Sequence, residues 1–254
     1  MIAKLQTKSS FSRTGQNREF AQFEALEKRL ERWAMPKIRK EMNVIARDIL
    51  TNYQLGGVAR VNAISIPDGV ARLEETLLPI YQRSIDNSIK ILKKQNPDVN
   101  FDDLKKDLEQ TYRAQAKTAA QQISRGTSNE VQRVVDKANA DGLSHQDTQK
   151  QLRKKLRRSN SVRSRVISET EIGAVTAESV DSTYKQYAPG AVVKVWVTRR
   201  DSKVRDPHQD AEGQTVHKEE NFIVDGEELP YPRYRGASPG NRINCRCRVR
   251  WEKV

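Results

Sequence analysis

Residues 244–251, NCRCRVRW, hold both cysteines of the chain, and arginines alternate with them. Side chains point to opposite faces along a strand, so this period of two predicts a half-buried strand over residues 243–251. Its apolar face would carry Ile243, Cys245, Cys247, Val249 and Trp251. Its other face would carry Asn244, Arg246, Arg248 and Arg250. We expect the cysteines to be small core residues and the arginines to form an exposed positive stripe that meets phosphate or an acidic partner.

A zinc site is an alternative interpretation of the same cysteines. His208 and His217 lie in the same region, so Cys245 and Cys247 would complete a Cys2His2 set. The usual spacing of two to four residues between paired cysteine ligands is missing, and we therefore expect no cofactor. A disulfide between residues two apart would strain an extended backbone. Two cysteines make no disulfide framework, which favours a reducing compartment.

The region before this segment contains further strand signals. Residues 191–198, AVVKVWVT, are rich in valine and predict a strand. Two short apolar segments, 222–224 and 228–229, flank Asp225 and Gly226, which predicts a hairpin.

The chain before residue 188 has helical spacing instead. Apolar residues recur every three, four or seven positions from about residue 18, and Pro36 should kink or split that helix. Asn100 and Ser144 are followed by aspartate three residues later, as at helix N-termini, while Gly126 should interrupt a helix. A long helix is expected over residues 162–187.

These patterns predict an α+β chain with a long, mostly helical N-terminal part and a small mixed C-terminal domain of short antiparallel strands. The expected divisions are a flexible arm at 1–16, a helical domain at 17–125 and a C-terminal domain at 126–254. That last domain would combine helices over 128–187 with a β-rich module over 190–254.

The net charge of +13 favours an anionic partner, and nucleic acid is the first candidate. Basic residues crowd one predicted helix and could face DNA, although a solvated helix face is the ordinary role of such a run. They are Arg153, Lys154, Lys155, Arg157 and Arg158. No apolar run reaches the roughly 20 residues of a membrane span, and the first residues lack the apolar core of a signal peptide.

An enzyme is the alternative class. Arg205, His208 and Asp210 lie close together in sequence, and a histidine beside an arginine could serve as a general acid or base with a phosphate clamp. A charged structural loop explains the same residues. The sequence contains no Walker loop, dinucleotide fingerprint, metalloprotease helix or EF-hand loop.

Four segments, taken in order, resemble the phage Mu F-like head morphogenesis family. They are RVISETEIGAV (165–175), WVTRRDSKVRDPHQDAEGQTV (196–216), FIVDGEELPYP (222–232) and NRINCRC (241–247), and the resemblance covers roughly residues 125–251. The matching residues are Glu169, Glu171, Trp196, Asp201, Arg205, His208, Gly213, Phe222, Gly226, Pro232, Asn244, Cys245 and Cys247.

The resemblance implies a minor head protein of a tailed phage rather than an enzyme. It implies a location inside the capsid near the portal vertex, after synthesis in the host cytoplasm. The implied partners are the portal protein, capsid or scaffolding proteins and packaged double-stranded DNA, with which the protein would also leave the head. The matched residues of the C-terminal module, His208 and both cysteines among them, would define its fold. The alternative is a small nuclease-like domain, carried in the virion, that uses Arg205, His208 and Asp210.

Overall fold

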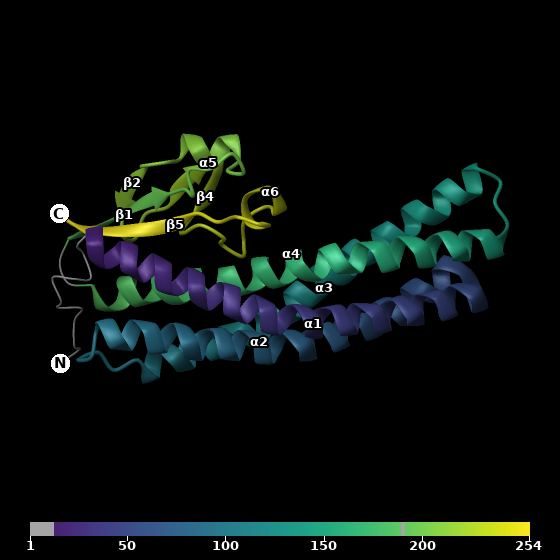
Figure 1. Ribbon diagram of the computed structural model, residues 1–254, viewed down its shortest axis with the longest axis horizontal. Coiled ribbons are helices and arrows are strands. Elements are labelled where there is room, and N and C mark those ends of the chain that lie inside the picture. The colour runs from purple at the N-terminus through teal and green to yellow at the C-terminus, as the bar shows by residue number, and fades with distance from the viewer. Residues whose placement is uncertain (1–12, 189–190) are drawn as a thin grey trace. The chain divides into compact units, whose positions relative to one another are not determined.

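The computed structural model describes residues 13–188 and 191–254 (Figure 1). Long helices come first: α1 (Arg13–Arg60), α2 (Ile66–Gln95), α3 (Asp102–Ala140) and α4 (His145–Tyr187). Short strands and helices follow, which confirms the α+β fold class. Residues 1–12 of the expected flexible arm lie outside the described residues, and α1 already begins at Arg13.

The helix starts that the sequence indicated are formed by side-chain caps. The Asn100 Oδ1 atom accepts a hydrogen bond from the Asp102 amide at 3.0 Å. The Ser144 hydroxyl accepts from the Asp147 amide at 3.1 Å and donates to the Asp147 carboxylate at 2.7 Å. Each cap satisfies amides that have no partner inside the helix, so α3 and α4 begin where local chemistry requires.

Two expected helix boundaries are absent: Gly126 lies inside α3, and residues 145–187 form one helix although a separate helix was expected over 162–187. Pro36 lies inside α1 and does not split it. A glycine costs a helix only about 1 kcal/mol, which the buried stripe along α3 outweighs. The break in α1 occurs instead at Gly56 and Gly57, where Gly57 has a φ of 63°, and a π-helical turn, η1 (Val61–Ser65), follows.

The strands form two antiparallel sheets. β1 (Val192–Val197) is the centre of a three-stranded sheet, between β2 (Thr215–His217) and β5 (Arg248–Lys253). β3 (Phe222–Val224) pairs with β4 (Glu227–Leu229) through a turn in which Asp225 and Gly226 have φ values of 53° and 73°. Both φ values are positive, as a type I′ hairpin requires, so the hairpin prediction is confirmed.

The terminal strand is shorter than expected. Of its first predicted residues, 243 and 244 form a turn after the short helix α6 (Pro239–Arg242), and 245–247 have no regular secondary structure. There the Cys245 amide donates to the Arg242 carbonyl at 3.2 Å, and Asn244 has a φ of 57°. The alternation of burial nevertheless runs from Cys245 to Trp251, and both cysteines are free and buried.

Contacts divide the chain into two compact units that do not follow sequence order. Of the described residues, unit 1 contains 13–31, 82–109, 169–188 and 191–254, and unit 2 contains 32–81 and 110–168. The core of unit 1 includes Phe23, Tyr184, Trp196 and Trp251. The core of unit 2 includes Ile38, Ile49, Leu77 and Leu156. The expected domains at 17–125 and 126–254 stay a prediction. Within the described residues, no helix has the length and apolar character needed to cross a membrane.

Candidate functional site

The centre of the C-terminal module in unit 1 is a buried group of one histidine and two cysteines. His208 lies on the short helix α5 (Asp206–Asp210), and the cysteines lie between α6 and β5. The His208 Nδ1 atom is 3.6 Å from the Cys245 sulfur and 3.5 Å from the Cys247 sulfur. Thus residues almost 40 positions apart meet around one nitrogen atom.

Asn241 fixes the orientation of the histidine ring. The buried Asn241 Nδ2 group donates to the Val224 carbonyl at 3.2 Å, which leaves Oδ1 to face the His208 Nε2 atom at 3.1 Å. An amide oxygen only accepts, so Nε2 carries a proton, and Nδ1 is the ring nitrogen that faces the two sulfurs. The sequence analysis missed Asn241, whose only local signal was its place in the segment NRINCRC.

Aromatic rings enclose the group. The ring of Trp196 on β1 meets the rings of His208 and Phe222 edge to face, with centroids 5.7 Å and 5.3 Å away. The pKa of Cys245 is lowered by hydrogen bonds with Cys247 and His208 and by the charge of Arg233, against the effect of burial. The hydrogen bond with Cys245 and burial raise the pKa of Cys247.

The structure corrects the four-ligand zinc alternative. His217 lies exposed on β2 and does not belong to the group. Among residues 13–188 and 191–254, the one cluster of three or more histidine, cysteine or acidic donors is His208, Cys245 and Cys247. His217 is not part of this cluster because successive side chains of a strand point to opposite faces, and on β2 His217 points to the exposed face.

The structure does not bring the proposed nuclease residues together at one surface. His208 is only 2% exposed, whereas Asp210 on the same helix is exposed. The Arg205 guanidinium donates to the Ile243 carbonyl at 2.5 Å, which holds the loop before α5 against the segment before β5. In this arrangement Arg205 and His208 stabilise the module.

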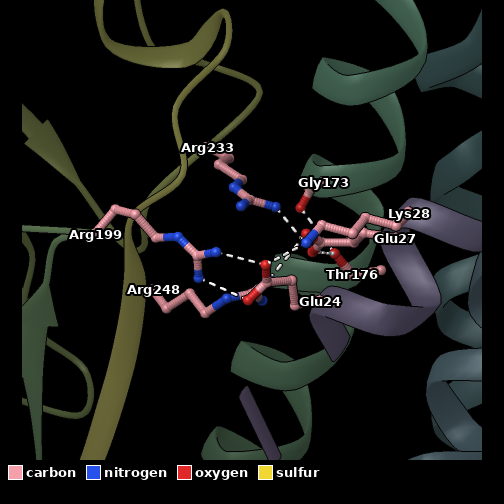
Figure 2. Close-up of polar contacts among 8 residues, drawn as sticks. All are labelled: Glu24, Glu27, Lys28, Gly173, Thr176, Arg199, Arg233 and Arg248. Carbon is pink, nitrogen blue, oxygen red and sulfur yellow. Dashed lines mark hydrogen bonds and ion pairs between the residues drawn. The ribbon is translucent and has the colours of Figure 1, made fainter. Parts of the chain in front are cut away.

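The buried Glu27 carboxylate on α1 binds two arginines from the C-terminal part of unit 1 (Figure 2). Glu27 Oε1 accepts from Arg233 at 2.9 Å and from the Thr176 hydroxyl at 2.6 Å, and Oε2 accepts from Arg248 at 2.9 Å. Burial raises the pKa of Glu27, but the two guanidinium groups outweigh it and lower the pKa to about 2. Glu27 is therefore an ionised anchor that joins α1, α4 and the terminal strand.

The stripe of Arg246, Arg248 and Arg250, in and just before β5, is not a free positive surface. Arg246 binds the Asp201 carboxylate through two contacts of 2.6 Å and 2.7 Å, and Arg250 binds Glu252 at 2.7 Å. The side chain of Arg248 is only 17% exposed and belongs to the Glu27 group. The expectation of three exposed arginines is wrong for Arg248, because the Glu27 carboxylate of helix α1 binds its guanidinium and covers it.

A comparison with family models identifies this region. Residues 129–250 match the model described as Phage Mu protein F like protein. This part of the chain belongs to that family. The family indicates a role in phage head morphogenesis, and the match confirms the resemblance seen over residues 125–251. No curated protein and no solved structure matched the chain.

The matched residues of the Mu F-like region are placed where they support its fold. Trp196, Phe222 and His208 form its aromatic core, and Asp201 and Arg205 tie loops to the segment before β5. Gly213 and Gly226 have φ values of 80° and 73°, a conformation that glycine adopts without strain. On the acidic helix, the Glu171 carboxylate binds Arg235 at 2.5 Å.

The basic run of α4 lies in unit 2 and is exposed. The side chains of Leu152 and Leu156 are buried, and the five predicted basic residues lie between and after them toward solvent. Lys155 pairs with Glu130 at 3.6 Å. In the part of the chain that the structure describes, no ion pair is formed by Arg153, Lys154, Arg157 or Arg158.

Proposed function

We propose that the chain is a minor head protein of a tailed phage that is built into the head at the portal vertex and contacts packaged DNA. The observation that carries this proposal is the match of residues 129–250 to the Mu F-like family. Portal, capsid or scaffolding proteins are the proposed protein partners. The site of synthesis would be the host cytoplasm, and passage out of the head with the DNA is part of the proposal.

The DNA contact is assigned to α4 rather than to the arginines in and just before β5. Four cationic side chains of α4 have no acidic partner within the described residues, whereas Arg246, Arg248 and Arg250 each bind a carboxylate. An unpaired cation can replace the counterions of a phosphate, and a paired one must first lose its partner. Arg133 and Lys137 of α3 add exposed positive charge along a cleft that Lys155 of α4 also lines.

We expect the change of Arg153, Lys154, Arg157 and Arg158 to glutamine to weaken binding to double-stranded DNA. Each lost phosphate contact lowers the slope of log K against log salt by about 0.9, so the slope should fall by roughly 3 to 4. The measurement is fluorescence anisotropy of a labelled duplex at several salt concentrations. Binding should depend little on DNA sequence, because phosphate contacts do not read bases.

A matched control removes the same charge elsewhere. Lys90, Lys93, Lys94 and Lys106 are exposed lysines of α2 and α3 in unit 1. Changing them to glutamine should leave the salt slope nearly unchanged. If both variants lower the slope of log K against log salt by the same amount, only the overall charge of the protein matters. The assignment of the DNA contact to α4 would then be wrong.

A further inference from the structure

We propose that His208, Cys245 and Cys247 bind one Zn²⁺ ion. Their donor atoms all lie within 4.8 Å of one another, and the two sulfurs are 3.5 Å and 3.6 Å from Nδ1. In a tetrahedral site with Zn–S bonds of about 2.3 Å and Zn–N bonds of about 2.05 Å, sulfur and nitrogen lie about 3.6 Å apart. Each sulfur therefore lies at the distance from Nδ1 that a shared zinc ion requires.

A hydrogen bond alone explains this arrangement less well. The Nδ1 atom has one lone pair in the ring plane and can accept from one thiol only. Both sulfurs nevertheless lie at almost the same distance from it. An ion shared by the three atoms accounts for this convergence, and paired sulfur donors with an imidazole are typical zinc ligands.

The surroundings of His208 match those of a metal ligand. The Asn241 Oδ1 atom accepts a hydrogen bond from the His208 Nε2–H group, and the orientation of Asn241 is fixed because a reversed amide would place its oxygen against the Val224 carbonyl oxygen. Histidine ligands are commonly held in this way, with the second ring nitrogen donating to a carbonyl or carboxylate oxygen. The ring is thereby prepared to bind a cation through Nδ1.

The charges of the group also allow a buried cation. Two thiolates balance the charge of Zn²⁺, so the complex is neutral and its burial carries no net charge. The nearby cation Arg233 is already paired with Glu27 at 2.9 Å. Three protein ligands leave the fourth tetrahedral position to a small exogenous donor such as water. The ion would join α5 to the segment before β5 and so stabilise the Mu F-like region.

The test uses the full chain, purified under reducing conditions without chelator. Elemental analysis should find about one zinc per chain, and a strong chelator should remove it and lower the melting temperature. Metal-free protein titrated with Co²⁺ should develop a thiolate charge-transfer band that saturates at one ion per chain and disappears when Zn²⁺ is added.

Variants assign the ligands. Cys245→Ser, Cys247→Ser and His208→Asn should each abolish the cobalt band, whereas the matched control His217→Asn should keep it. Asn241→Leu should weaken zinc binding by roughly 10- to 100-fold, as the loss of an outer-shell partner does. The decisive result is that of the wild-type chain, which does not depend on the folding of any variant. Wild-type protein with two reduced thiols, no zinc, no cobalt band and a melting temperature unaffected by chelator would overturn the proposal.

Discussion

Glu27→Gln should destabilise the protein by about 3–5 kcal/mol. The carboxylate is 8% exposed and binds two guanidinium groups, so its loss leaves Arg233 and Arg248 buried without a counter-charge. Removal of one partner of a buried ion pair typically costs this much, because the remaining charge stays out of water. The measurement is the free energy of unfolding from urea titration, followed by circular dichroism.

Glu24→Gln is the matched control for this prediction. Glu24 lies one turn earlier on α1 and binds Arg199 and Lys28, but its side chain is 25% exposed (Figure 2). An ion pair near solvent contributes little, so the control should lose no more than about 1 kcal/mol. If the two variants lose equal free energy of unfolding, then burial of the Glu27 ion pairs does not make them more important for stability than the exposed pairs of Glu24.

Glu19→Gln should stabilise the protein at pH 8 and leave its stability unchanged at pH 4. Burial raises the pKa of Glu19 to about 7, although a hydrogen bond from the Tyr184 hydroxyl at 3.1 Å and the charge of Arg248 oppose the shift. A group with a raised folded pKa gives its full stability below its unfolded pKa of 4.5 and loses it as the pH rises through about 7. A shift of this size corresponds to about 3 kcal/mol.

The check is the difference in unfolding free energy between wild type and Glu19→Gln across pH 4 to 8. It should grow from near zero to about 2–3 kcal/mol, because glutamine cannot ionise but can still accept from Tyr184. Glu75→Gln, at an exposed position of α2, is the control and should show no such trend. A difference that is independent of pH would mean that folding does not shift the pKa of Glu19.

Local chemistry made much of the fold predictable from the sequence. Ser144 and its partner Asp147 are three residues apart, so the cap that starts α4 could be recognised without any knowledge of the rest of the chain. The same holds for Asp225 and Gly226 in the hairpin turn. Gly126 does not interrupt α3 as its local propensity predicts, because tertiary packing keeps it inside a continuous helix.

The polar anchors could not be predicted in this way, because their partners are distant in sequence. Glu27 and Arg233 are 206 residues apart. A signal for Glu27 existed, since it lies four residues after Phe23 and three before Leu30, on a face that is otherwise apolar. In the candidate site, the alternation of residues correctly placed both cysteines in a core, but sequence spacing alone kept both His208 and His217 as zinc ligands.

The central proposal is that this chain, whose residues 129–250 match the Mu F-like family, is a component of the phage head at its portal vertex. The most direct test is quantitative mass spectrometry of purified procapsids assembled from the capsid, scaffolding and portal proteins of the same phage together with this chain. The account predicts that the chain copurifies with procapsids and falls to background when the portal protein is omitted. Its absence from procapsids, or an amount that does not depend on the portal protein, would contradict the account.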